Sequence, residues 1–67
     1  MADIDQFANE SGDGVRFSAS SPRGDTWMRV NWGDIDVSFD GPDLSGAKAF
    51  RDAAVEAGLT IRDLSSN

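Results

Sequence analysis

Residues 26–40 read Thr-Trp-Met-Arg-Val-Asn-Trp-Gly-Asp-Ile-Asp-Val-Ser-Phe-Asp, and this stretch decides the predicted fold. Successive side chains of a β-strand point to opposite faces, and here apolar residues alternate with polar ones on both sides of Gly33-Asp34. A two-residue hairpin turn at Gly33-Asp34 would put all of the alternating apolar residues on one face: Met28, Val30, Trp32, Ile35, Val37 and Phe39. The stretch therefore predicts two antiparallel strands, in which Trp32 pairs with Ile35, Val30 with Val37 and Met28 with Phe39.

Residues 15–20 repeat the alternation, with Val15, Phe17 and Ala19 on one face. If residues 21–26 form a loop, this strand pairs with 26–32 and completes a three-stranded antiparallel meander over 15–40. The loop would contain Arg23-Gly24-Asp25, the tripeptide that integrin ligands display. A turn built from ordinary turn formers is the preferred interpretation of this three-residue match.

Residues 43–57 are predicted to form one amphipathic helix. Gly41-Pro42 ends the preceding strand, and apolar residues then recur at three- and four-residue steps: Leu44, Ala47, Phe50, Ala54 and Ala57. Gly58 stands where helices end in the left-handed conformation. Residues 59–64 could add a short edge strand, and 65–67 form a tail.

Residues 1–14 are predicted to form an N-terminal arm or a short helix, because Ile4, Phe7 and Ala8 stand at helical spacing. In this interpretation Phe7 docks on the core. The predicted fold is α+β, with the order β-β-β-α, a possible fourth strand and one small domain over 1–67.

Composition excludes several function classes. The 67 residues include no cysteine and no histidine, so we expect no disulfides, no thiolate metal site and no enzyme. The net charge is −6, and residues 1–43 carry nine acids against three arginines. Direct nucleic-acid binding is therefore disfavoured, and a protein partner with a basic surface is favoured. We also expect a cytoplasmic protein without a membrane segment, because no apolar run is long enough and no signal-peptide pattern is present.

Four aspartates, Asp34, Asp36, Asp40 and Asp43, are the candidate ligands for a metal ion. Calcium and magnesium prefer oxygen ligands, but the spacing does not match the calcium-binding loop pattern. We therefore interpret the four as a solvated acidic surface that protects strand edges, and we predict no metal and no cofactor.

Trp27 and Arg29 would lie on the polar face of the predicted sheet, and both residue types are enriched in binding hot spots. Trp27 could instead be a local cover for neighbouring side chains. The predicted function is a non-enzymatic binding or regulatory module that docks through Trp27, Arg29, Asp34, Asp36, Asp40 and Asp43. Inhibitors of nucleic-acid-binding proteins, such as phage-encoded anti-CRISPR proteins, share this size and charge but no motif. The alternative is a structural homodimer or complex subunit from a salt-adapted organism, in which the acidity only maintains solubility.

Overall fold

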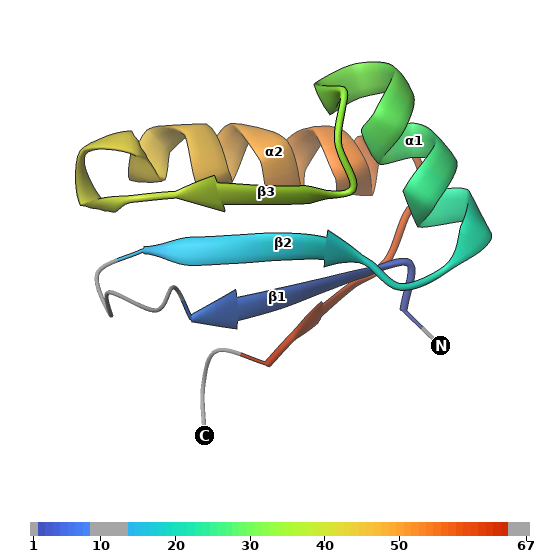
Figure 1. The fold of residues 1–67 in the computed structure, drawn as a ribbon, viewed down its shortest axis with the longest axis horizontal. Helices are drawn as coiled ribbons and strands as arrows, with labels where there is room; N and C mark the ends of the chain where they lie inside the picture. Colours follow the sequence, from blue (N-terminus) through green and yellow to red (C-terminus); the bar gives the residue numbers. More distant parts are fainter. Residues whose placement is uncertain (1, 9–13, 65–67) are drawn as a thin grey trace.

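The computed structural model describes residues 2–8 and 14–64, which form a four-stranded sheet and two α-helices (Figure 1). In chain order the elements are β1 (Ile4–Ala8), β2 (Val15–Ala19), α1 (Pro22–Trp32), β3 (Asp36–Phe39), the short 3-10 helix η1 (Gly41–Asp43), α2 (Leu44–Glu56) and β4 (Ile61–Asp63). The predicted tail at 65–67 and part of the predicted arm lie outside the described residues. The α+β class is confirmed.

The strand order in the sheet is β3-β2-β1-β4, so the N-terminal strand lies inside the sheet and β3 and β4 are its edges. β2 is antiparallel to both of its neighbours, with Phe17 opposite Gln6 on one side and Val37 on the other. β4 is parallel to β1, with Ile4 opposite Ile61. The sheet is therefore mixed, and the predicted antiparallel meander is wrong.

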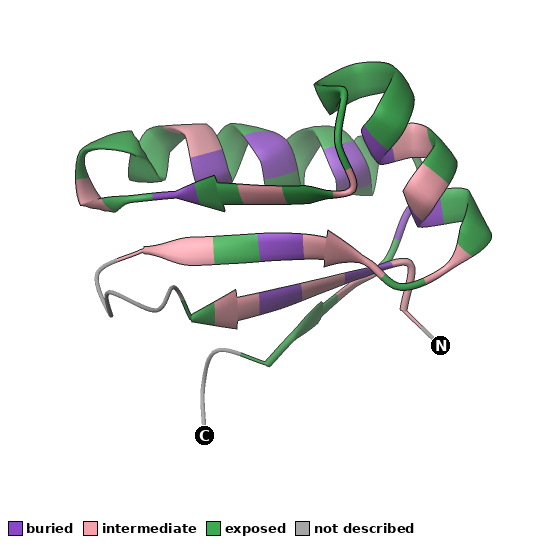
Figure 2. Cartoon of the chain, in the orientation of Figure 1, coloured by how far each residue is buried: buried purple, intermediate pink, exposed green. Residues whose placement is uncertain are grey.

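The core lies on one face of this sheet, where both helices contribute to it (Figure 2). Phe50 of α2 stacks on Phe17 of β2 with 4.3 Å between the ring centroids, and Met28 of α1 is fully buried beside them. The buried apolar residues are Ile4, Phe17, Met28, Phe39, Ala47, Phe50, Ala54 and Leu59. The opposite face of the sheet carries no helix of the described chain.

Residues 22–32 form a helix, which contradicts the predicted strand at 26–32 and its hairpin. Ser21 is the N-cap and its hydroxyl accepts from the Gly24 N–H at 3.0 Å, while Pro22 occupies the first turn, where its missing N–H costs nothing. Gly33 is not a hairpin residue: it ends the helix in the left-handed conformation at φ 75°. Val30, predicted to be in the core, is 78% exposed. Helix capping at both ends thus prevailed over an alternating pattern.

Residues 4–8 form β1, so the predicted short helix or frayed arm is also wrong. Ile4 and Gln6 are buried on the helix-covered face, whereas Phe7 lies half-buried on the opposite face and does not dock on the core. The helical spacing of Ile4, Phe7 and Ala8 was therefore accidental. β1 instead brings the N-terminal residues between β2 and β4.

Other predicted elements are present. The strand expected at 15–20 is β2, the helix expected at 43–57 contains α2, and the edge strand expected within 59–64 is β4. Gly58 has the predicted left-handed conformation at φ 85°, and Leu59 after it is buried.

Candidate functional site

Four aspartates accompany the edge strand β3, and we call Asp34, Asp36, Asp40 and Asp43 the acidic edge. Asp34 lies between α1 and β3, where its carboxylate accepts from the Ile35 N–H at 2.7 Å. Asp36 begins β3, and Asp40 and Asp43 follow it on the way into α2. Because β3 pairs only with β2 among the described strands, its outer edge presents backbone groups, and the four carboxylates stand before, on and after this strand.

Most basic side chains form an ion pair or a hydrogen bond with another residue of the chain. Four of the six make ion pairs, namely Arg16–Asp36, Arg29–Asp25, Lys48–Asp52 and Arg62–Asp5, and Arg23 donates to the Gly58 carbonyl at 2.7 Å. Asp34 and Asp43 of the acidic edge, like Glu56 on α2, make no ion pair within residues 2–8 and 14–64. Part of the negative surplus is therefore left without a counter-charge beside β3.

Trp27 and Arg29 do not lie with the acidic edge on an open strand face, so that predicted placement is wrong. Both belong to α1, where Arg29 pairs with Asp25 at 2.6 Å. Trp27 is half-buried and meets the ring of Phe50 edge-on at 5.5 Å, so it covers the core. It also lines a shallow groove of about 500 Å³ between α1 and the end of α2.

Trp32 is another aromatic residue that the sequence prediction misplaced, besides Phe7 and Trp27. We expected it in the core, but its side chain remains 39% exposed while its ring packs edge-on against Phe39 of β3 at 5.8 Å. It follows Met28 by four residues, so a helical interpretation of 22–32 would have placed both on one side of the helix. Trp32 is thus the exposed aromatic side chain in contact with β3.

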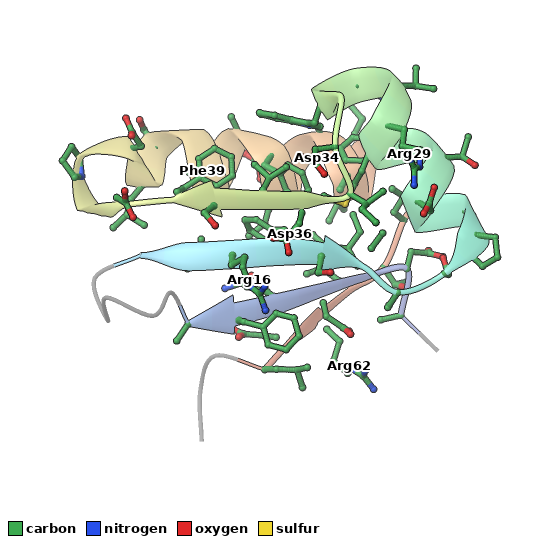
Figure 3. All side chains as sticks on the ribbon, viewed as in Figure 1. Arg16, Arg29, Asp34, Asp36, Phe39 and Arg62 are labelled. Carbon is green, nitrogen blue, oxygen red and sulfur yellow. The ribbon has the colours of Figure 1, made fainter. Side chains whose placement is uncertain are left out.

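We call the face of the sheet that no helix of the described chain covers the open face (Figure 3). Its strand residues are Asp5, Phe7, Arg16, Ser18, Asp36, Ser38 and Arg62. Arg16 lies at its centre, 3.1 Å from the Asp36 carboxylate and 5.0 Å from the centre of the Phe7 ring. Arg62 of β4 binds the Asp5 carboxylate with two nitrogens, at 3.1 and 3.3 Å. Among the described residues, Arg16 and Arg62 of the open face are thus each paired with an aspartate of the same face.

Asp3 joins the beginning of β1 to both α1 and β4. Its carboxylate accepts from the Ser21 hydroxyl at 2.7 Å and from the Thr60 N–H at 3.1 Å. The hydrogen bond from Ser21, followed by that from Thr60, lowers the pKa of Asp3 below its usual value, and the nearby Arg23 guanidinium adds to this effect. These partners hold the ends of three elements together, so the role of Asp3 is structural.

The Arg23-Gly24-Asp25 tripeptide lies in the first turn of α1 and not in a displayed loop. Gly24 is buried against the Asp3 backbone, and the two charged residues are held by Gly58 and Arg29. The predicted turn is therefore wrong, because the tripeptide forms the start of a helix.

Two grooves of the described chain differ in the charged residues that line them. The groove beside Trp27 has no carboxylate in its lining, and a second groove of about 410 Å³ between α2 and β4 has only Asp63. Across the described ranges, no three acidic side chains converge in a way that could hold a metal ion.

Comparisons with protein-family models, curated proteins and solved structures give no match for this chain. Neither helix of the described chain has the length and apolar character needed to cross a bilayer.

Proposed function

We propose that this chain is a non-enzymatic protein-binding module whose acidic edge docks on a basic surface of a larger protein. The observation that carries the proposal is the distribution of charge. Most cationic side chains have a partner within the molecule, whereas Asp34 before β3 and Asp43 after it make no ion pair within residues 2–8 and 14–64. A basic partner would supply that counter-charge, and its approach would be accelerated by the net charge of −6.

Trp32 provides an exposed aromatic surface that packs against β3, two residues before Asp34 in the chain. Binding energy in protein interfaces concentrates on a few aromatic and arginine side chains surrounded by polar groups. Trp32 is held in place by Phe39 and Phe50 and yet keeps 39% of its surface exposed. Little side-chain entropy would therefore be lost when a partner covers it.

An inhibitor of a nucleic-acid-binding protein is one form that such a module takes. A basic channel that binds phosphates also attracts a row of carboxylates, and the affinity of such a complex falls as salt is raised. Direct binding of this chain to nucleic acid is not part of the proposal, because the molecule itself is acidic.

The test is an affinity capture from lysate at low and high salt with two charge-matched variants. The variant Asp34→Asn with Asp43→Asn removes two charges from the acidic edge. The control, Asp52→Asn with Glu56→Gln, removes two charges from the exposed surface of α2. The proposal predicts a partner that the control and the parent chain retain at low salt and that the edge variant loses. Equal recovery by both variants would show that only overall charge matters and would refute the assigned surface.

A spectroscopic measurement locates the contact. Trp27→Phe leaves Trp32 as the single tryptophan of the two in the chain. Because Trp32 is partly exposed, partner binding at the acidic edge should shift its emission to shorter wavelength. An unchanged emission in a complex shown to form would place the contact elsewhere.

The alternative function is a structural homodimer. It would use a different surface, the open face of the sheet, which no helix of the described chain covers.

A further inference from the structure

The side chains of the open face form two rows that run across the strands. From β3 to β4, the first row is Asp36, Ser18, Asp5 and Arg62, each directly opposite the next in the strand register. The second row is Ser38, Arg16 and Phe7. The N–H of Leu64 donates to the Gln6 carbonyl at 2.7 Å, so Leu64 extends this row beside Phe7.

When the first row of one copy faces the same row of a second copy in reverse order, an aspartate lies opposite an arginine at both edges of the sheet. A two-fold axis parallel to the strands, halfway between β1 and β2, would place β3 opposite β4 of a second copy and β2 opposite β1. Asp36 then faces Arg62 of the second copy, and Ser18 faces Asp5. In the second row, Arg16 faces Phe7 of the second copy, a cation–aromatic contact of the kind that Arg16 already makes within the chain at 5.0 Å.

We propose that the open face binds a second copy of this chain around such a two-fold axis. Facing sheets pack about 10 Å apart with their strands within roughly 30° of each other. The edge strands lie about 7 Å from the axis. An angle of roughly 30° between the strands of the two sheets therefore moves facing edge residues apart by only about 4 Å. The long side chain of Arg62, 57% exposed, can span this shift.

A second copy fits this face better than a nucleic acid does. Arg16 and Arg62 are each paired with a carboxylate of the same face, at 3.1 Å in both cases, so the face offers no unbalanced positive charge to phosphates. An acidic or a basic protein would match only one of the two signs. The second copy offers both signs, since Asp36 faces Arg62 of the other copy at each edge of the sheet.

The predicted association is weak. The four strands, of three to five residues each, cover roughly 300 Å² in the plane of the sheet, which is small for a protein interface. We therefore expect a reversible dimer with a dissociation constant on the order of 100 μM. The inference does not rest on the proposed function, because replacing Asp34 and Asp43 leaves both rows intact.

The first measurement is sedimentation equilibrium of the full chain from about 10 μM to 1 mM, a range chosen to bracket the expected constant. The mean mass should rise toward that of a dimer. A monomer at every concentration would overturn the proposal and leave the open face to another partner.

Two charge reversals then test the axis itself. Asp36→Arg should bring two arginines together in its own dimer, and Arg62→Glu should bring two carboxylates together, so each variant alone should be monomeric. An equimolar mixture restores an arginine opposite an acid at both edges, and it should form a heterodimer. Lys48→Glu and Asp52→Arg are matched charge reversals on the exposed surface of α2. Both variants should dimerise as the parent chain does in sedimentation equilibrium.

The mixture decides between this axis and any other arrangement. Dimers that persist in both single variants, or a mixture that stays monomeric, would overturn the proposal. Circular dichroism verifies that the variants fold. Should a reversal unfold, Asp36→Asn and Arg62→Gln replace it, and each should weaken association roughly two- to fivefold; no weakening would contradict the assigned contacts.

Discussion

The two faces of the sheet differ sharply although they come from the same short strands. Phe17 is fully buried between α2 and the sheet, while its neighbour Arg16 lies on the open face with 44% of its side chain exposed. One face holds the fold through aromatic packing, and the other holds charges that pair with one another. From this difference we assign the stability of the fold to the covered face and propose binding for the other, in a domain of 67 residues.

The largest expected effect comes from the covered face. Phe17→Ala removes a ring that stacks on Phe50 at 4.3 Å and meets Phe39 edge-on at 6.0 Å. We expect a loss of about 3–5 kcal/mol in the free energy of unfolding, measured by urea denaturation. A loss below about 1 kcal/mol would mean that this face is not the core.

Gly24→Ala tests how closely α1 approaches β1. A Cβ at this position would overlap the carbonyl oxygen of Asp3, so we expect a loss of about 1–3 kcal/mol by the same denaturation. Alanine normally stabilises a helix relative to glycine, so the sign of the change is informative. Thr26→Ala, on the exposed surface of α1, is the control and should be nearly neutral. A more stable Gly24→Ala variant would contradict the contact.

Asp3→Asn should reduce stability in a pH-dependent way. Because the pKa of Asp3 is lower in the folded chain than its usual 3.8, its carboxylate stabilises the fold above that pH. This contribution is lost as the pH falls through the lowered folded-state value. Unfolding measured at neutral pH and again near pH 2.5 should therefore show a difference between parent and variant that disappears in acid. A difference of the same size at both values would contradict the assigned ionic role.

The smallest effect is expected at Val30, where the sequence pattern predicted a core position. Val30 is 78% exposed, so Val30→Ala should change the free energy of unfolding by no more than about 0.5 kcal/mol. A loss of about 2 kcal/mol or more, which is the cost of a core truncation, would restore the strand interpretation of 26–32.

The sequence predicted the elements whose local signals agree with their tertiary environment. In α2 the apolar spacing, Gly58 and the buried Leu59 all support one helix, and β2 and β3 alternate between buried and exposed residues. The α+β class and the short edge strand within residues 59–64 followed from these. The acidic edge could also be found, because β3 was correctly recognised as a strand.

Residues 22–32 could not be assigned by alternation, because their apolar residues fit both a strand and a helix. Capping decided the outcome: Ser21 and Pro22 begin α1, Asp25 pairs with Arg29 one turn later, and Gly33 ends it. The open face depended on β1, whose alternation of Ile4 and Gln6 with Asp5 and Phe7 was overlooked in favour of helical spacing. Without β1 and β4 in one sheet, no sequence pattern could bring Arg62 to Asp5 or set Phe7 beside Arg16.

The most direct test of the account is to remove the charges of the open face together. Replacing Asp5, Arg16, Asp36 and Arg62 with serine leaves the net charge of the chain unchanged at −6. In dilute solution, where copies do not pair, we predict a loss of less than about 2 kcal/mol in the free energy of unfolding, because three of the four side chains are 44–57% exposed and only Asp5, at 14%, is largely covered. A loss as large as that of Phe17→Ala would contradict the division between a face that holds the fold and a face that is available for binding.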